Sequence, residues 1–307
     1  YSIDEEAVEG YKKDIDGYNL KNSYRPGTVS VEGTKTWDDG NNQDGKRPDK
    51  IKVLLNKTVN GETTKVAEKE VTKDNWTYEF TDLPKYEGGK AITYSIDEEA
   101  VEGYTKTVEG YNLKNSYTPE TVTIKGTKTW DDKENQDGKR PASITVKVMD
   151  GSTIVDTLEV TANSGWKFES KNLPKYRDGQ EIVYTLSEDA VTQYETKIDN
   201  FTITNSYKPE TIKISGQKVW DDANNQDGKR PASVKVKILN GDTVVDEQNV
   251  TSANDWKYES KALPKYASGQ EITYTVSEEA VPGYTSKVDG YNITNSYTPG
   301  TTTVSGS

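Results

Sequence analysis

Three lysines stand where the strand pattern predicts an apolar side chain. Lys35, Lys128 and Lys218 each lie two residues after a glycine and two residues before a tryptophan, within runs of alternating apolar residues. Residues two apart in a half-buried β-strand share a face, so each lysine is predicted to point into a core. Burial lowers the pKa of an amine, and a neutral lysine amine can act as a nucleophile.

A glutamate and an asparagine occupy the same kind of position later in each repeat. Glu98 follows Tyr94 and Ile96 at alternate positions, and Asn115 lies two residues after Leu113. An unpaired buried charge is very costly, so the lysine, glutamate and asparagine of one repeat are predicted to meet. The equivalent residues in the other two repeats are Glu188, Asn205, Glu278 and Asn295.

Two kinds of chemistry fit such a trio, and the residue pattern alone leaves both open. The first is a buried Lys–Glu ion pair that is hydrogen-bonded to the asparagine. The second is a covalent isopeptide bond between lysine and asparagine. In that reaction the neutral amine attacks the asparagine carbonyl, while a protonated glutamate polarises the carbonyl oxygen and relays protons as ammonia leaves.

The strands that must hold these residues belong to a unit that is repeated three times. The segment Asn-Gln-Asp-Gly-Lys-Arg-Pro occurs at 42–48, 135–141 and 225–231, and Asn-Ser-Tyr recurs about 90 residues apart. We call the repeats modules 1, 2 and 3. The predicted boundaries are 1–27 for the C-terminal fragment of a truncated module, 28–118 for module 1, 119–208 for module 2, 209–298 for module 3, and 299–307 for the start of a further first strand.

Each module alternates apolar and polar residues in short runs separated by Gly, Pro, Asn and Asp, which predicts β-strands. About seven short strands per module predict an all-β fold of tandem antiparallel β-sandwiches. The linkers, such as 118–121, contain proline and are too short to be flexible tethers, which predicts an elongated, semi-rigid rod. In module 2 the predicted strands are 121–130, 143–149, 154–160, 166–169, 182–188, 194–198 and 201–207.

Five smaller features also carry expectations. A short insertion in module 1, near 56–64, is predicted to lengthen a hairpin loop. Residues 1–25 keep equivalents of the trio in Glu5 and Asn22 but lack a lysine partner, so we expect them to be poorly ordered or packed against module 1 or another molecule. Segment 38–44 is interpreted as a solvated turn, because its spacing does not suit calcium. The repeated Leu-Pro-Lys-Tyr is interpreted as a turn, and the six tryptophans as core anchors.

Composition excludes several classes of function. The 307-residue chain has no Cys and no His, so the commonest metal ligands and nucleophile–base pairs are missing, and we expect no cofactor, no metal and no turnover enzyme. A net charge of −12 argues against a nucleic-acid partner. No apolar run is long enough for membrane insertion.

The modules closely resemble the collagen-adhesin B-type repeats (Cna B-type domains) of Gram-positive surface proteins and pilins. The resemblance rests on K-x-W-D-D at each start, D-G-K-R-P in the following loop and the final [IL]-x-N-S-Y, and it covers all three modules. It implies an inverse-immunoglobulin-like sandwich and an internal isopeptide bond between the first and last strands. Carried over by position, the implied crosslinks are Lys35–Asn115, Lys128–Asn205 and Lys218–Asn295, promoted by Glu98, Glu188 and Glu278.

These features favour the structural stalk of a Gram-positive cell-surface adhesin, which projects a ligand-binding domain from the cell wall. Its only chemistry would be a single-turnover, autocatalytic isopeptide reaction. We expect an extracellular, wall-anchored location, with signal peptide and anchor outside this chain. Adjacent modules would be its partners, and host matrix would be bound only by other domains. The alternative is a binding module for a matrix protein or glycan, for which the polar insertion at 56–64 is the one candidate feature.

Overall fold

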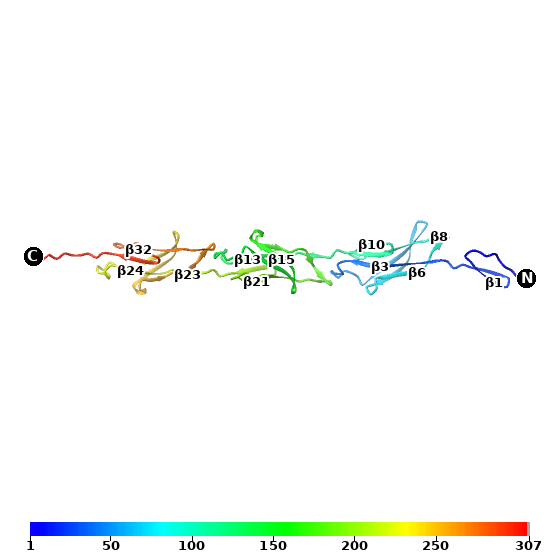
Figure 1. The fold of residues 1–307 in the computed structure, drawn as a ribbon, viewed down its shortest axis with the longest axis horizontal. Helices are drawn as coiled ribbons and strands as arrows, with labels where there is room; N and C mark the ends of the chain where they lie inside the picture. Colours follow the sequence, from blue (N-terminus) through cyan, green and yellow to red (C-terminus); the bar gives the residue numbers. More distant parts are fainter. Residues whose placement is uncertain (306–307) are drawn as a thin grey trace. The chain divides into compact units, whose positions relative to one another are not determined.

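The computed structural model describes residues 1–305, and almost all of their regular structure is β-strand (Figure 1). Contacts divide the chain into two compact units, residues 1–123 with 171–183, and residues 124–170 with the chain from 184 onward. The only helices in this described part are two short 3-10 turns, η1 (Ala162–Ser164) and η2 (Ser252–Asn254). The expectation of an all-β fold is confirmed.

The first unit contains the N-terminal hairpin β1–β2, a four-stranded sheet in the order β10-β11-β3-β6 and a three-stranded sheet in the order β5-β4-β9. The small pairs β7–β8, β12–β17 and β18–β19 complete it. Its strands are β1 (Lys12–Asp16), β2 (Asn19–Ser23), β3 (Thr28–Asp38), β4 (Lys50–Val59), β5 (Glu62–Thr72), β6 (Thr77–Pro84), β7 (Tyr86–Glu87), β8 (Lys90–Ala91), β9 (Thr93–Glu98), β10 (Thr105–Glu109), β11 (Asn112–Ser116), β12 (Thr121–Val122), β17 (Leu173–Pro174), β18 (Tyr176–Arg177) and β19 (Gln180–Glu181).

The second unit repeats this pattern twice, with four-stranded sheets β16-β13-β22-β21 and β27-β24-β33-β32 and three-stranded sheets β15-β14-β20 and β26-β25-β31. Two small pairs, β23–β28 and β29–β30, accompany them. Its strands are β13 (Lys125–Asp131), β14 (Ser143–Asp150), β15 (Thr153–Thr161), β16 (Lys167–Glu169), β20 (Tyr184–Glu188), β21 (Glu195–Asp199), β22 (Thr202–Ser206), β23 (Thr211–Ile212), β24 (Ser215–Asp221), β25 (Ser233–Asn240), β26 (Thr243–Thr251), β27 (Lys257–Glu259), β28 (Leu263–Pro264), β29 (Tyr266–Ala267), β30 (Gln270–Glu271), β31 (Tyr274–Glu278), β32 (Thr285–Asp289) and β33 (Asn292–Ser296).

One pairing in each module departs from the antiparallel pattern. The first long strand runs parallel to the last strand, as β3 does to β11, β13 to β22 and β24 to β33. All other pairs are antiparallel among the described strands. The two ends of each module's chain therefore lie side by side in one sheet, and this places residues distant in sequence on neighbouring strands.

Alternation along the strands produces the cores, because every second side chain faces the opposite sheet. In β14 the residues at alternate positions, Ile144, Val146 and Val148, are buried. The tryptophans pack at the margins of these cores rather than at their centres. Trp37 contacts Trp76 edge to face, with ring centroids 5.2 Å apart. Burial of such rings supplies much of the stabilisation of a module that has no disulfide.

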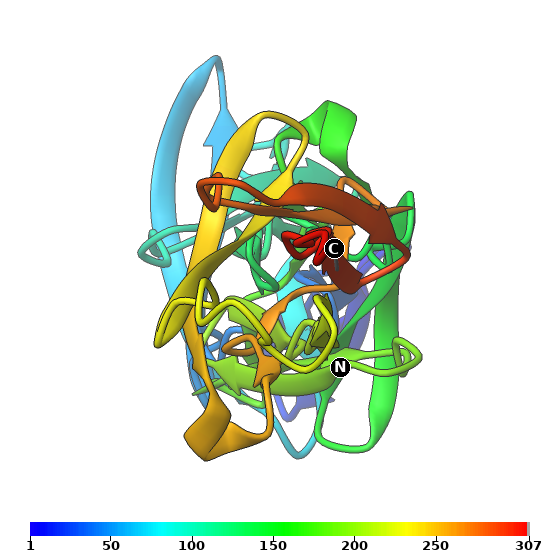
Figure 2. The ribbon, with the colours of Figure 1, turned by 90° about the vertical axis from the view of Figure 1, so that its left-hand side faces the viewer.

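Two smaller expectations need correction. The Leu-Pro-Lys-Tyr segment does not form a simple turn: in module 2 it begins with the short strand β17, and Leu173 is buried. The insertion in module 1 lengthens the strands and not the loop. Strands β4 and β5 meet at a two-residue turn, Asn60-Gly61. The φ angles of both residues are positive (54° and 85°), as in the commonest tight hairpin turns. Figures 1 and 2 show this long hairpin projecting beyond its sandwich.

The N-terminal fragment forms an ordered ladder between β1 and β2. Its apolar side chains Ile15 and Leu20 face each other in this ladder but remain exposed. Asn22 donates a hydrogen bond of 2.9 Å to Glu5. Backbone pairing and the Gly17 turn therefore hold a hairpin that buries little apolar surface. At the other end, residues 301–305 form no strand, and the last two residues of the predicted strand lie outside the described part.

A glycine in β3 permits the close approach of its neighbours. A Cβ atom at Gly33 would overlap the carbonyl oxygen of Tyr111 and lie 2.8 Å from the Tyr78 hydroxyl, which donates a hydrogen bond to that carbonyl. We predict that Gly33→Ala destabilises module 1 by about 1–3 kcal/mol, because overpacking forces these groups apart. Faster hydrogen exchange in peptides from β3, β6 and β11 would report the change.

Gly27→Ala is the matched control, since a Cβ there would meet nothing closer than the Lys85 side chain at 3.9 Å. Equal exchange in the two variants would show that the close approach at Gly33 is not a constraint on the fold.

Candidate functional site

Two strands of one sheet and one strand of the facing sheet position each predicted trio. In module 1, Lys35 lies on β3 and Asn115 on the parallel neighbour β11, while Glu98 ends β9 in the opposite sheet. Lys35 pairs in register with Leu113, so Asn115 is the diagonal neighbour on the same face. Diagonal neighbours lie about 7–8 Å apart, which a lysine side chain can span.

The structure buries every member of the three trios. Each lysine and glutamate side chain is at most 1% exposed, and the asparagines are as deeply buried. The lysine Nζ to glutamate Oε1 distance is 3.1 Å in module 1, 3.2 Å in module 2 and 3.8 Å in module 3. The trios are Lys35, Glu98 and Asn115; Lys128, Glu188 and Asn205; and Lys218, Glu278 and Asn295.

The asparagine side chains lack hydrogen bonds. Neither Nδ2 nor Oδ1 of Asn115, Asn205 or Asn295 has a partner in the described part of the chain. Leaving a buried donor or acceptor unsatisfied costs about 1–3 kcal/mol, and most native proteins avoid it. The same two atoms lack hydrogen bonds in all three modules, so this is a property of the repeat and not of a single module.

Burial favours the neutral form of all three lysines and of one glutamate, Glu278. Loss of water lowers the pKa of Lys35 and of Lys128, and it lowers the pKa of Lys218 to about 8, against the attraction of the nearby glutamate. Burial likewise raises the pKa of Glu278. A neutral amine beside a neutral acid is the combination that nucleophilic attack with general acid–base assistance needs.

Each lysine amine also lies over an aromatic ring, a contact that the sequence pattern did not reveal. Lys35 Nζ is 4.4 Å from the Trp37 ring centroid, and the equivalent distances in modules 2 and 3 are 4.3 and 4.1 Å. The tryptophan two residues along the strand therefore forms one wall of the site. Shared strand parity was the available signal, since it places both side chains on one face.

The Asp-rich loop beside the trio is a turn, as the sequence predicted, but two of its carboxylates are not solvated. Asp39 and Asp44 are buried. Asp39 accepts a two-pronged hydrogen bond from Arg47 and another from the Tyr104 hydroxyl, at 2.6, 3.0 and 2.9 Å. These bonds hold the pKa of Asp39 below its usual value, although burial opposes them. Within residues 1–305, no group of three or more His, Cys, Asp or Glu side chains is placed to hold a metal ion.

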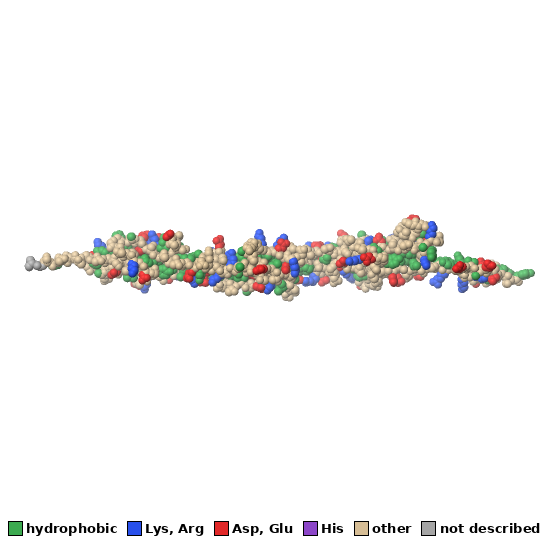
Figure 3. Space-filling view, turned by 45° about the horizontal axis from the view of Figure 1, so that its top comes forward, with side chains coloured by type: hydrophobic (Ala, Val, Ile, Leu, Met, Phe, Trp, Pro, Cys, Tyr) green, Lys and Arg blue, Asp and Glu red, His purple; other side chains and the backbone are tan. Residues whose placement is uncertain are grey.

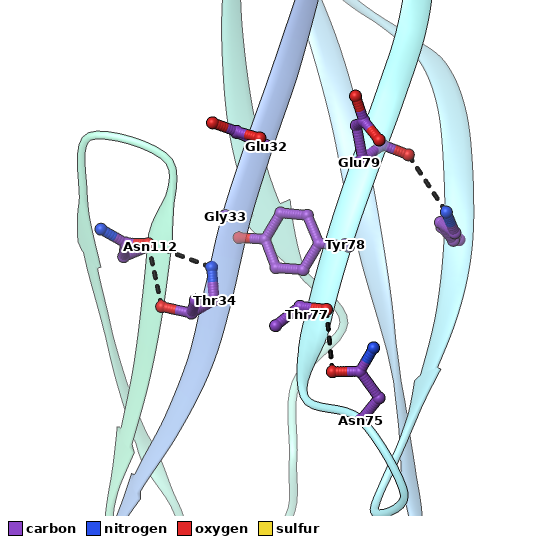
Figure 4. Close-up of a pocket in the computed structure, with 9 residues that line it drawn as sticks. Glu32, Gly33, Thr34, Asn75, Thr77, Tyr78, Glu79 and Asn112 are labelled. Atoms are coloured by element: carbon purple, nitrogen blue, oxygen red, sulfur yellow. Dashed lines mark hydrogen bonds between the residues drawn. The ribbon is translucent and has the colours of Figure 1, made fainter.

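A surface hollow of about 660 Å³ in module 1 is lined by none of the three residues of the trio. Figure 4 shows Tyr78 across it from Thr34, which is hydrogen-bonded to Asn112. Its lining is largely polar, and the visible surface of the modules mixes both signs of charge (Figure 3). The buried trio, not this hollow, is the chemically distinctive site.

Repeated β-sandwiches with a buried lysine, glutamate and asparagine define a class of protein, a tandem array of structural repeats. The family model of the Cna protein B-type domain matches residues 31–116, 124–206 and 214–296. The chain therefore belongs to the Cna B-type domain family, as the resemblance predicted. In the described residues, no helix is long and apolar enough to cross a membrane.

The chain is also similar to individual proteins and solved structures. The collagen adhesin of Staphylococcus aureus is 44% identical over 316 residues, which cover 98% of this chain but only 26% of that protein. The solved structure of two B repeat units (B1B2) of the collagen-binding protein Cna of S. aureus is 41% identical, with a TM-score of 0.55 over 94% of this chain and 80% of that one. A single B repeat unit (B1) is 43% identical, with a TM-score of 0.29 over 59% of this chain and 100% of that one.

The lowered pKa of Lys218 generates a pH-dependence prediction. In an Asn295→Ala chain, Lys218 stays a free amine, and its folded pKa of about 8 lies below the ordinary 10.5. Between these values the unfolded lysine binds a proton that the folded one has released, so the unfolding free energy of module 3 should rise with pH. Pulse proteolysis in urea at several pH values, with module 3 peptides identified, measures it.

The control is the double variant Asn295→Ala/Lys218→Met, which removes the contribution of this amine and keeps that of every other group. The difference between the two chains in the unfolding free energy of module 3 should change between about pH 8 and pH 10.5. A difference that is independent of pH would contradict a lowered pKa at Lys218.

Proposed function

We propose that this chain is a set of stalk repeats of a Gram-positive cell-surface adhesin, each stabilised by an internal Lys–Asn isopeptide bond. The observation that carries the proposal is the orphaned asparagine amide beside a buried Lys–Glu pair in every module. A purely non-covalent trio leaves both polar ends of the amide unsatisfied. The covalent reaction removes the amide nitrogen as ammonia.

The reaction needs only the three side chains. The lone pair of lysine Nζ attacks Cγ of the asparagine, and the Nζ–Cγ bond forms as the Cγ–Nδ2 bond breaks. The protonated glutamate donates a hydrogen bond to the carbonyl oxygen. As it passes its own proton to Nδ2 it takes one from the attacking amine, so it ends protonated again and Nδ2 leaves as ammonia. The fold supplies the orientation, which is worth about 7–11 kcal/mol in well-aligned intramolecular reactions.

The position of the bond favours a load-bearing role. Strands β3 and β11 are parallel neighbours, so a force that pulls on the start of β3 and the end of β11 shears them past each other. A Lys35–Asn115 bond would carry this force directly between the two strands. In module 2 such a bond closes a loop of about 77 residues, for which the chain-entropy model gives about 4–5 kcal/mol of stabilisation.

The linkers between modules also suit a stalk. Asp44 accepts hydrogen bonds of 2.8 Å from the Tyr117 hydroxyl and from the backbone N–H of Glu120, so a buried carboxylate of module 1 holds the linker that follows it. On the other side, Lys175 pairs with Glu120 at 3.0 Å. The same contacts recur after module 2, where Asp137 binds Tyr207 and Glu210 at 2.9 and 2.7 Å, and Lys265 pairs with Glu210 at 3.0 Å.

The remaining parts of the proposal follow from the family. Module boundaries at 28–118, 119–208 and 209–298 enclose the three family matches. We place the chain outside the cell, anchored to the wall through segments beyond it, with its modules as each other's partners. The chain corresponds to 26% of the S. aureus collagen adhesin, so matrix binding is assigned to other domains of the full protein. The polar hairpin at 56–64 does not favour a ligand site.

Intact mass tests the bond. The chain should be lighter than its sequence mass by three ammonia molecules, one per module. Glu188→Ala should reduce the loss to two, because module 2 then lacks its proton relay. A mass equal to that of the sequence would leave only the ion-pair interpretation.

Asp189→Ala is the matched control for Glu188→Ala. Asp189 is the adjacent acid, but its side chain is half exposed and pairs with Lys147. This variant should still lose three ammonia molecules. If Glu188→Ala also loses three, the relay role of Glu188 is wrong.

Single-molecule pulling tests the load-bearing role. In the wild-type chain, unfolding of module 2 should release only the residues outside the Lys128–Asn205 loop. Glu188→Ala should release about 77 more residues, an added extension of about 25 nm. Equal extension in the two chains would show that the bond does not shield the loop from force.

A further inference from the structure

The residue that faces the reactive asparagine across the outer hairpin differs between modules. Lys106 pairs with Asn115, Thr196 with Asn205 and Ser286 with Asn295 in the antiparallel ladders. The three trios are otherwise identical in residue type. The three modules therefore share the same buried trio but differ in the side chain that lies next to it on the outer strand.

In module 2 this residue contacts the buried acid. The Thr196 hydroxyl lies 2.8 Å from Oε2 of Glu188, while Oε1 of the same carboxyl lies 3.2 Å from Lys128 Nζ. Glu188 has no exposed side-chain surface, whereas Thr196 is exposed. The hydroxyl therefore lies at the boundary between the acid and solvent, and it holds one carboxyl oxygen so that the other faces the amine.

Module 3 has a looser version of this contact. The Ser286 hydroxyl is 3.5 Å from Oε2 of Glu278, and Lys218 Nζ is 3.8 Å from Oε1. Lys218 donates a hydrogen bond of 3.0 Å to the carbonyl oxygen of Val219 instead. The amine therefore lies farther from the carboxyl group in module 3 than in module 2.

Module 1 replaces the hydroxyl with an ammonium group. Lys106 donates to Asp97 and, at 2.8 Å, to the backbone carbonyl of Glu98 rather than to its carboxyl group. Both carboxyl oxygens of Glu98 then approach Lys35, at 3.1 and 3.3 Å. Lys35 is therefore the side chain that contacts the Glu98 carboxyl group in module 1, and among the described residues no hydroxyl group takes part.

We propose that Thr196 is a positioning residue for isopeptide formation in module 2, and that a hydroxyl at this position sets how fast a module crosslinks. The inference rests on the proposed function. Glu188 must take a proton from Nζ of Lys128 and deliver it to the departing Nδ2 of Asn205. A hydrogen bond that fixes Oε2 reduces the orientations that the carboxyl group samples, and precise orientation accelerates such a relay.

Threonine suits this role better than serine. Its β-branched side chain has fewer accessible χ1 rotamers, so less freedom is lost when the hydroxyl binds the acid. The 2.8 Å contact in module 2 and the 3.5 Å contact in module 3 agree with this order.

The test follows bond formation in the full chain. Pulse-labelled cell-free translation is stopped with acid at successive times, and peptide mapping gives the linked fraction for each Lys–Asn pair. Thr196→Val should slow the Lys128–Asn205 bond roughly fivefold, the effect of losing about one hydrogen bond. The bonds of modules 1 and 3 in the same chain should form at their usual rates, and Thr196→Ser should restore most of the lost rate.

A gain of rate provides a second arm that does not depend on the folding of Thr196→Val. Ser286→Thr should accelerate the Lys218–Asn295 bond. Thr185→Val, on the outward face of β20, is the control and should change nothing. Unchanged rates in both Thr196→Val and Ser286→Thr, with all three bonds formed, would overturn this inference and leave the proposed function intact. Absence of linked peptides in every module would overturn both.

Discussion

A lysine amine held in an apolar core is the constraint on which each module depends. Out of water, the charged amine is costly, and the facing glutamate only partly compensates, as the lowered pKa of Lys218 indicates. The module therefore carries a reactive amine whose neutral form is more populated than that of an exposed lysine. The adjacent asparagine amide, without hydrogen bonds of its own, is the group that this amine can attack. In a chain without cysteine, that reaction would replace the disulfide as a covalent brace.

The polar groups around the core serve two different purposes. Beneath the tryptophan, Asp39 and Arg47 form a satisfied ion pair that fixes the loop after the first strand. A few residues on, Asp44 uses its carboxylate to bind the linker that leaves the module. One short segment thus fixes the loop after the first strand through Asp39 and the linker after the module through Asp44. These two roles explain why its acidic residues are buried, although the segment is hydrophilic.

Repetition in this chain preserves the trio but not its surroundings. Module 1 has a longer β4–β5 hairpin, and the residue opposite the asparagine is Lys106, Thr196 or Ser286 in turn. The outer strand is exposed, so these substitutions cost little folding energy. In modules 2 and 3 this position reaches the buried acid, so a substitution there would alter the proposed reaction while the fold stays the same.

Strand alternation in the sequence was sufficient to predict the all-β fold and the burial of Lys35, Glu98 and Asn115, because a period of two assigns every side chain to a face. It was not sufficient for the parallel pairing of β3 with β11, the contact of Thr196 with Glu188 or the burial of Asp44. Those depend on which strands become neighbours and where loops return. The β3–β11 pairing and the contact of Asp44 with Tyr117 join residues more than 60 positions apart, and Thr196 reaches Glu188 only because the chain turns back between β20 and β21. Periodicity is a local property that identifies a face, whereas only the tertiary structure determines what lies opposite that face.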